Sequence, residues 1–284
     1  MRRPVTALVL ALAGLWLVAA SPVRAEVTCA DIPKACIETV LKDGETEFFA
    51  INKTPGLPIS FRIEVKRNNL KITDGFNLPI VLKGGERRKL FTLKPIAAGK
   101  AWSYSYEFFW LRGDYTARHD ASHVYRLPYD SGTSFKISQS CNGVFSHTGA
   151  YSNALDFDLP RGTRILAARG GIVVESIEEF GPGAPLPSYL EKSNSVIIQH
   201  DDKTLGMYFH LRQNGAEVEV GDKVRAGDLI GYSGSSGFSQ GPHLHFEVSS
   251  ARRDLENTES FPIRLRASTG LVTCPAEGRR LTAP

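Results

Sequence analysis

Short apolar runs separated by turn residues dominate residues 46–112. The runs are rich in aromatic and β-branched residues, which favour strands. They read TEFFAI, ISFRIEV, RKLFTL and WSYSYEFFWL, and the segments NKTPGLP, KGGER and AAGK between them have turn chemistry. Within ISFRIEV, apolar and polar residues alternate, as expected of a strand with one buried face. Short strands at this spacing predict a small β-sandwich.

The β pattern continues from about residue 137. TRILAARGGIVVESIEEF predicts two strands joined by a Gly-Gly turn, and SVIIQH, LGMYFHL and DLIGYSG predict further strands. Helical periodicity is weak, and it predicts one helix, over residues 35–41. Residues 126–135 are rich in turn formers and predict a linker. We therefore expect an all-β chain, with a β-sandwich-like accessory domain over residues 26–130 and an antiparallel β-sheet domain over residues 131–284.

The first 25 residues have the layout of a secretory signal peptide. Two arginines precede an apolar run over residues 5–20, and the small-residue pattern Val23-Arg24-Ala25 follows. A membrane anchor is the alternative, but a span needs about 20 apolar residues and this run is shorter. No cysteine stands at the cleavage point, and no later stretch is apolar enough to cross a bilayer. We expect cleavage after Ala25 and a periplasmic or secreted protein with no stable membrane span.

Charge and cysteine content narrow the function classes. The formal charge of +4 and the pI near 8.8 are mildly basic, and no basic stripe predicts a nucleic-acid partner. The four cysteines, Cys29, Cys36, Cys141 and Cys274, permit disulfides in an exported chain, and three pairings are open. Their wide spacing argues against a structural zinc site, whose ligands come in pairs two to four residues apart.

Histidines supply the candidate chemistry. In GPHLHFEV, a strand places His243 and His245 on one face and turns Leu244 and Phe246 towards a core. His147, Asp156 and His210 occupy similarly suggestive segments, and two histidines with one carboxylate suit a catalytic zinc site. His119, His123 and His200 have polar or turn surroundings and are expected to be surface or turn residues. Asp158 shares a strand face with Asp156 and is a competing ligand.

Four motifs in order carry a family resemblance. The segments H…ALDFDLPRGTRILAARGGIV, MYFHL, VEVGDKVRAGDLIGYSGSSG and GPHLHFEV, over residues 145–250, resemble the lysostaphin-type, or LytM-type, zinc metallopeptidases. The resemblance implies that His147, Asp156 and His245 hold Zn2+ and that His210 and His243 work in catalysis. The chain departs from the family at the first motif, because eight residues separate His147 from Asp156 and must loop out. Residues 131–284 are then expected to form the metallopeptidase domain.

The resemblance implies an exported zinc-dependent endopeptidase that hydrolyses peptide crosslinks of bacterial peptidoglycan. His243 is expected to accept a proton from water and pass it to the leaving amine, and His210 to stabilise the oxyanion. The loop 181–194 and the turn 231–241 are expected to wall a groove for the peptide stems. Ser239 is a candidate for holding the substrate or orienting the His243 segment, with a plain turn residue as the alternative. The form of the signal peptide, with no lipid anchor and no repeated wall-binding modules, predicts a Gram-negative periplasm. Crosslinks containing D-amino acids are implied by the resemblance alone.

Two other classes compete with this interpretation. A non-catalytic LytM-type protein that activates another cell-wall hydrolase would lack zinc ligands, whereas all five expected residues are present here. VGDKVRAGDLIGY is also similar to the turns of biotinyl and lipoyl carrier domains, but the sequence around Lys223 is not that of a carrier lysine. The N-terminal domain carries no identifiable chemistry, and an envelope protein is its candidate partner.

Overall fold

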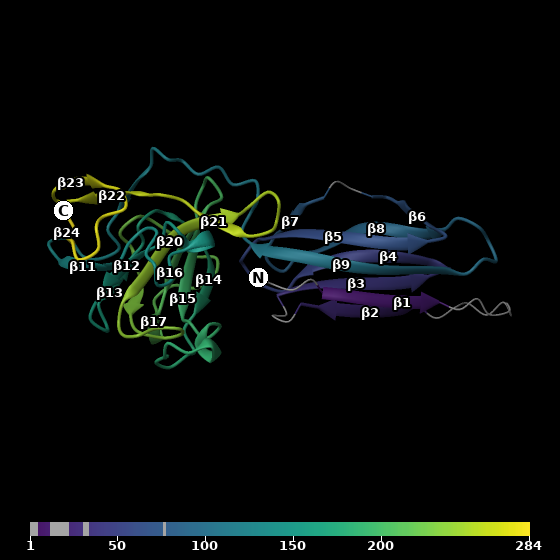
Figure 1. The fold of residues 1–284 in the computed structure, drawn as a ribbon, viewed down its shortest axis with the longest axis horizontal. Helices are drawn as coiled ribbons and strands as arrows, with labels where there is room; N and C mark the ends of the chain where they lie inside the picture. Colours follow the sequence, from purple (N-terminus) through teal and green to yellow (C-terminus); the bar gives the residue numbers. More distant parts are fainter. Residues whose placement is uncertain (1–4, 12–22, 31–33, 76–77) are drawn as a thin grey trace. The chain divides into compact units, whose positions relative to one another are not determined.

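The structure, a computed structural model, describes residues 5–11, 23–30, 34–75 and 78–284 (Figure 1). The chain divides into two compact units between Arg112 and Gly113. Nearly every element is a strand, and the described ranges contain no α-helix, so the predicted all-β class is confirmed. The predicted boundary between two domains, at residues 130 and 131, stays a prediction.

The first unit contains two antiparallel sheets that share one core. Their strand orders are β1-β9-β5-β7 and β2-β3-β4-β8-β6. The strands are β1 (Val5–Ala11), β2 (Arg24–Cys29), β3 (Ala35–Lys42), β4 (Glu45–Asn52), β5 (Ile59–Asn68), β6 (Leu70–Thr73), β7 (Ile80–Leu82), β8 (Arg87–Pro95) and β9 (Trp102–Arg112). Alternate residues of β9 point inward, so Tyr104 and Tyr106 meet Phe48 of the other sheet edge-on, with ring centroids 5.3 and 5.5 Å away.

The helix predicted over residues 35–41 is wrong, because this segment forms β3. Strand β3 pairs with β2 on one side and with β4 on the other. The β-branched residues Ile37 and Thr39 are buried, and such residues fit a pleated surface better than a helix. Tertiary pairing on both sides thus overrides a weak helical pattern.

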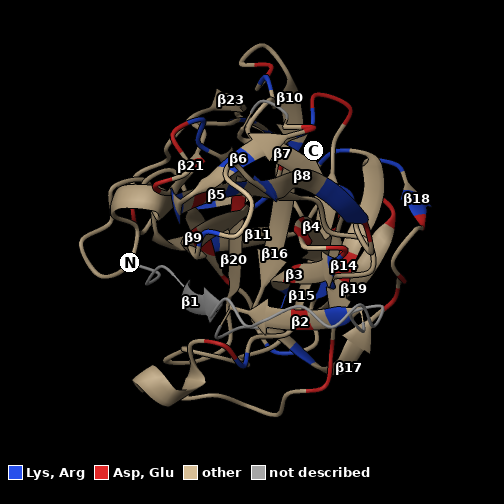
Figure 2. Cartoon of the chain, turned by 90° about the vertical axis from the view of Figure 1, so that its right-hand side faces the viewer, with Lys and Arg blue, Asp and Glu red and all other residues tan. Residues whose placement is uncertain are grey.

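Charged residues of both signs are interspersed along the strands (Figure 2). Lys89 Nζ lies 2.6 Å from Glu47 Oε1 on the neighbouring strand β4, and Arg87 Nε lies 2.6 Å from Glu38 Oε2 on β3, which is one strand further along the sheet. All four side chains are partly exposed to solvent, where such pairs contribute about 0–1 kcal/mol each. These ion pairs lie on the exposed face of the sheet that contains β4 and β8, and we assign them no role in a functional site.

The second unit is organised around a nine-stranded sheet with the order β18-β14-β15-β16-β20-β12-β11-β24, to whose strand β20 the strand β21 also pairs. The strands are β18 (Lys223–Val224), β14 (Gly171–Ile177), β15 (Ser195–Gln199), β16 (Leu205–Phe209), β20 (Leu244–Ala251), β12 (Leu155–Asp158), β11 (Ser134–Gln139), β24 (Arg280–Thr282) and β21 (Thr258–Ser260). Strands far apart in the sequence are therefore neighbours at its centre.

Two three-stranded sheets complete the second unit. One has the order β13-β19-β17 and the other the order β10-β22-β23. Their strands are β13 (Arg164–Leu166), β19 (Leu229–Ser233), β17 (Leu211–Ala216), β10 (Val124–Arg126), β22 (Arg264–Ala267) and β23 (Gly270–Val272). Residues of all three sheets, among them Phe157, Ile230 and Leu265, belong to one buried cluster, so one core supports the whole unit.

Both pairs of cysteines form disulfides. Cys29 bonds to Cys36 within the first unit, and Cys141 bonds to Cys274 within the second. The first bond joins the facing ends of β2 and β3. The second joins the segment after β11 to the segment before β24, across a sequence separation of 133 residues. One of the three pairings left open by the sequence is thereby selected.

The predicted signal peptide lies only partly within the described residues. Val5–Ala11 forms β1, which pairs along its whole length with β9, and residues 1–4 and 12–22 lie outside the described ranges. Cleavage after Ala25 stays a prediction. The described residues include no helix that is both long enough and apolar enough to span a bilayer.

His200 is part of a buried polar cluster in the second unit. Its Nδ1 donates to the carbonyl of Gly170 at 2.9 Å, and its Nε2 has no hydrogen-bond partner among the described residues. Burial lowers the pKa of His200 to about 4, and the charge of Arg169 acts in the same direction. The imidazole is therefore neutral in the folded protein at pH 7, and it makes the folded state sensitive to acid.

We expect removal of the Cys141–Cys274 bond to destabilise the second unit selectively. In the C141S/C274S variant, the lost restraint on the unfolded chain amounts to about 2–5 kcal/mol. All three tryptophans, Trp16, Trp102 and Trp110, precede Gly113. Tryptophan fluorescence therefore reports the first unit, while far-UV circular dichroism reports both. Urea unfolding should show an earlier transition by circular dichroism and an unchanged one by fluorescence.

The C29S/C36S variant is the matched control for this experiment, and it should shift the fluorescence transition instead. If C141S/C274S leaves both transitions in place, the bond does not stabilise the second unit.

The titration of His200 should weaken the second unit in acid. Because the folded pKa lies below the ordinary value of 6.5, the unfolded state takes up the proton first, and stability is lost as the pH falls from about 6.5 to about 4. The loss approaches about 3 kcal/mol at 1.36 kcal/mol per pKa unit. Urea unfolding of chelator-treated protein should show a shallower loss for His200→Asn, which keeps a donor for Gly170. Equal slopes for the two proteins would contradict this assignment.

Candidate metal centre and active site

Strand register brings Asp156 and His245 side by side. Asp156 of β12 lies directly opposite His245 of β20. Successive residues of a strand face opposite ways, and Leu244 and Phe246 are fully buried in the core. His245 therefore projects from the other face, towards Asp156. The predicted strand over HLHFEV is confirmed from Leu244 onward.

His147 reaches the same point from the connection between β11 and β12. The segment turns tightly, because His147 N donates to the carbonyl of Gly143 at 3.0 Å. The eight residues that follow His147 include the 3-10 turn η1 (Gly149–Tyr151), and they return the chain to Asp156. The expected loop between the two residues is thus present. It does not separate them: His147 Nε2 lies 3.2 Å from Asp156 Oδ1.

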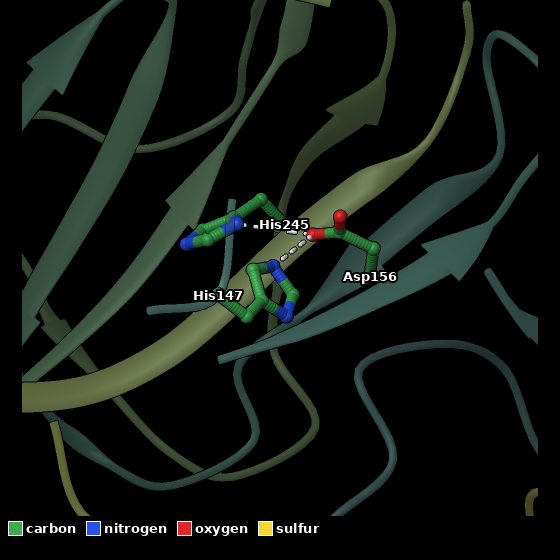
Figure 3. Close-up of side chains that lie close together, drawn as sticks. All are labelled: His147, Asp156 and His245. Carbon is green, nitrogen blue, oxygen red and sulfur yellow. Dashed lines mark hydrogen bonds and ion pairs between the residues drawn. The ribbon is translucent and has the colours of Figure 1, made fainter. Parts of the chain in front are cut away.

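The three side chains converge on one point (Figure 3). His245 Nδ1 lies 3.0 Å from Asp156 Oδ1, the same oxygen that His147 approaches. One ligand atom from each residue lies within 4.8 Å of the others. Ligands around tetrahedral zinc are separated by about 3.4 Å at metal–ligand distances of about 2.0–2.2 Å. Two nitrogens and one oxygen at this spacing fit a zinc ion and leave a fourth position open.

Hydrogen bonds fix which nitrogen each ligand can offer. His147 Nδ1 donates to the carbonyl of Ser140 at 2.9 Å, so its Nε2 carries no proton in the neutral ring and faces Asp156. His147 is fully buried, and its Nε2 makes no hydrogen bond of good geometry among the described residues. A buried nitrogen without a hydrogen bond is costly. A cation at the common point would satisfy it.

Electrostatics at this point favour a cation. Burial alone would raise the pKa of Asp156, but the imidazoles of His147 and His245 beside its Oδ1 outweigh burial and hold the pKa well below its usual range. Burial would lower the pKa of His245, but its hydrogen bond to Asp156 and the charges of Asp156 and Glu247 raise it. The carboxylate thus stays ionised, and its negative charge favours a cation beside it.

His210 and His243 stand beside the three converging residues. Their ring centroids are 4.4 Å apart, and that of His210 is 6.1 Å from the ring of His245. His210 follows β16 with a positive φ of 65°, which redirects its side chain away from the strand path. Burial, followed by the charge of His243, lowers the pKa of His210 to about 3.

Backbone carbonyls orient both of these imidazoles. His210 Nδ1 donates to the carbonyl of Ser236 at 2.7 Å, and His243 Nδ1 donates to the carbonyl of Gly241 at 2.8 Å. Since a carbonyl only accepts, the proton of each neutral ring lies on Nδ1, and Nε2 is left as the acceptor. Ser239 donates its hydroxyl to the same Gly241 carbonyl at 2.7 Å, so it stabilises the turn that holds His243.

The loop 181–194 packs against the turn that orients His210. Gly183 N donates to the carbonyl of Ser235 at 2.8 Å. Asn194 is fully buried, and its backbone N–H donates to Ser236 Oγ at 2.9 Å. The loop 181–194 and the turn 231–241, which were expected to wall a groove, are therefore neighbours joined by these hydrogen bonds.

The remaining sequence candidates lie elsewhere. Asp158 is half exposed and pairs with Lys136 at 3.3 Å, so it does not compete with Asp156. His119 stacks on Phe261, and the rings of His123 and His200 both contact Tyr125. None of these histidines belongs to the three-residue group that could hold a metal.

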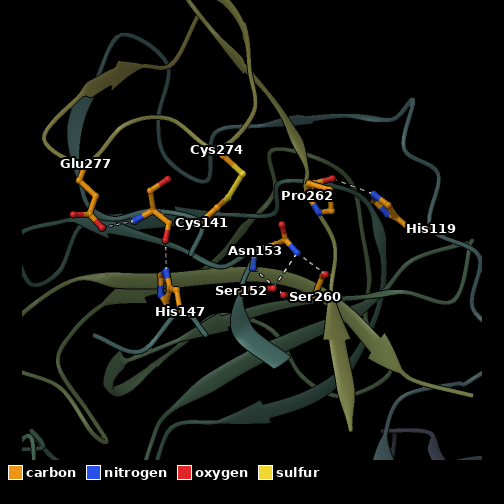
Figure 4. The surroundings of a disulfide bond; sticks show 10 residues. His119, Cys141, His147, Ser152, Asn153, Ser260, Pro262, Cys274 and Glu277 are labelled. Carbon is orange, nitrogen blue, oxygen red and sulfur yellow. Dashed lines mark hydrogen bonds between the residues drawn. A yellow bond between two sulfur atoms is a disulfide. The ribbon is translucent and has the colours of Figure 1, made fainter. Parts of the chain in front are cut away.

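Gln139 and the carbonyl of Ser140 are neighbours of the site that the sequence did not single out. Gln139 Nε2 donates to Asp156 Oδ2 at 3.1 Å, and the Ser140 carbonyl accepts from His147. Figure 4 shows His147, Glu277 and the Cys141–Cys274 bond around this segment. The sequence gives only a weak indication of these neighbours: Gln139 and Ser140 form a polar strand end immediately before a cysteine and a glycine-containing turn.

A family model described as Peptidase family M23 matches residues 150–257. The match includes Asp156, His210, His243 and His245, and it begins three residues after His147.

Similar proteins carry peptidase names. A "DD-carboxypeptidase/endopeptidase Mpg" of Neisseria meningitidis is 33% identical over 102 residues, which are 36% of this chain and 21% of that protein. The "Peptidoglycan DD-endopeptidase ShyA" of Vibrio cholerae is 35% identical over 34% of this chain and 20% of that protein. The chain thus spans about a fifth of the length of these curated relatives. The catalytic domain of lysostaphin from Staphylococcus simulans is 27% identical in structural comparison, with a TM-score of 0.30, over 50% of this chain and 95% of that one.

Proposed function

We propose that this chain, whose residues 150–257 match the model described as Peptidase family M23, is an exported zinc-dependent endopeptidase that hydrolyses peptide crosslinks of bacterial peptidoglycan. The convergence of His147, Asp156 and His245 on one point is the observation that carries the proposal. Peptidoglycan as the substrate is supported by the names of the relatives, which include DD-endopeptidases and lysostaphin.

In this proposal, zinc would be held by His147 Nε2, His245 Nδ1 and Asp156 Oδ1. These are the three atoms that approach one another in the structure. Bound there, zinc would supply a Lewis acid that polarises the scissile carbonyl and makes water a better nucleophile. The chain's own contribution is to bury His147 and Asp156 and to fix the tautomer of His147.

His210 and His243 would handle protons. Both present an unprotonated Nε2 when neutral. Because burial disfavours the charged form of His210, His243 is the ring proposed to accept a proton from the attacking water. The same hydrogen bonds refine the expected oxyanion role of His210. Its Nε2 can donate to an oxyanion only after it has taken up a proton, because the other ring proton is held by the Ser236 carbonyl. Proton uptake and charge stabilisation are therefore successive states of one imidazole.

Export and location are also part of the proposal. The signal-like leader and two disulfides support an oxidising compartment outside the cytoplasm, the periplasm in a Gram-negative cell. An envelope protein is the proposed partner of the first unit. The runner-up function is a non-catalytic activator of another cell-wall hydrolase. The presence of all three candidate ligands and both further histidines favours the enzyme.

Substitutions at His243 and His245, two positions apart, distinguish a zinc ligand from a residue that transfers protons. His245→Ala removes a donor and should abolish stoichiometric zinc, measured by elemental analysis after dialysis. His243→Ala should keep zinc near one equivalent and lower turnover by about 10²–10⁴-fold, the range for loss of a general acid or base. Equal loss of zinc in both variants would contradict the assigned roles.

Digestion of isolated peptidoglycan tests the reaction itself. Crosslinked wall fragments incubated with the protein should yield new amine and carboxyl ends, identified by mass spectrometry, and a chelator should abolish them. Adding zinc back should restore the products. Zinc-loaded protein that releases no product from any crosslink type would favour the activator function.

A further inference from the structure

Gln139 stands at a bulge that faces the carboxylate of the metal centre. Between β11 and β12 the register shifts after Ile137, so that Gln139 lies opposite Asp156. A regular ladder would place Ser138 there, whereas the extra residue re-aims the side chain that follows. Gln139 is 7% exposed, so every polar atom of its amide needs a partner.

The Gln139 amide connects two parts of the site. Its Nε2 donates to Asp156 Oδ2 at 3.1 Å and to Ser146 Oγ at 2.7 Å. Its Oε1 accepts from the backbone N–H groups of Phe145 and Ser146, both at 3.1 Å. Ser146 immediately precedes His147. One side chain thus contacts the carboxylate of one candidate ligand and the backbone that carries another.

A glycine permits this close approach. A Cβ at Gly143 would lie 2.3 Å from Gln139 Cγ and 3.0 Å from its Oε1. The carbonyl of Gly143 accepts from His147 N at 3.0 Å. The turn that carries His147 is therefore packed directly on the Gln139 side chain, and a shift of the amide would be transmitted to that turn.

We propose that Gln139 is a positioning residue that sets the mutual geometry of the zinc ligands Asp156 and His147. The inference rests on the proposed function, because it assigns Gln139 a role towards the same zinc ion. By holding Oδ2, the amide leaves Oδ1 as the carboxylate oxygen that faces the two imidazoles. By accepting hydrogen bonds from the backbone of Phe145 and Ser146, it fixes the position of the backbone that carries His147.

Preorganisation of this kind should appear in zinc affinity. Loss of a residue that orients a metal ligand typically weakens metal binding by about 10–100-fold. Gln139→Met keeps the length and burial of the side chain but removes all four hydrogen bonds. We expect its zinc dissociation constant, measured by competition with a chromophoric chelator, to rise by about 10–100-fold. Gln139→Asn keeps the amide but is one methylene shorter, so it should change affinity in the same direction if the methionine variant does not fold.

Asn153→Ala is the matched control in the same connecting segment. Asn153 Nδ2 donates to the carbonyl of Ser260 at 2.8 Å and touches no candidate ligand. Its loss should lower the unfolding temperature and leave zinc affinity within about threefold of the parent.

The outcomes separate this inference from the proposed function. A parent chain that binds no zinc would overturn the proposed function. Parent-like zinc affinity in a folded Gln139 variant would overturn the inference alone. An equal loss in Asn153→Ala and Gln139→Met would also overturn it, because general loosening of the segment would then be the cause.

Discussion

The second unit depends on one buried carboxylate. Asp156 has little contact with water; its Oδ1 is hydrogen-bonded to His245 Nδ1 at 3.0 Å, and His147 Nε2 lies 3.2 Å from the same oxygen. An isolated charge in this environment would cost several kcal/mol. The carboxylate therefore constrains everything around it: a strand that delivers His245, a turn that delivers His147, and an amide that satisfies its second oxygen.

Much of this arrangement could be predicted from local pattern. Period-two alternation identifies ISFRIEV as a strand, and the spacing of His243 and His245 places them on the side of the chain opposite Leu244 and Phe246. The glycine-rich turns before His243 are also evident from composition. These features are local, and their physics depends on a few consecutive residues.

Other features depend on contacts that no local pattern encodes. Residues 35–41 show a weak helical pattern, yet pairing on both edges makes them a strand. The return of the chain from His147 to Asp156 depends on a 3-10 turn within eight residues. The position of Gln139 opposite Asp156 depends on a one-residue register shift. Regular alternation would have placed Ser138 there instead. Cysteine pairing likewise needed the three-dimensional structure.

The Cys141–Cys274 bond has a topological consequence for the site. All five histidine and aspartate residues assigned to it lie between the two cysteines, so they belong to one covalent ring. A single proteolytic cut within that ring, for example in the loop 181–194, opens the ring but releases no fragment. His147 and Asp156 on one side of the cut would remain tethered to His210, His243 and His245 on the other. The five side chains of the candidate site thus stay on one covalently connected molecule after a single cut.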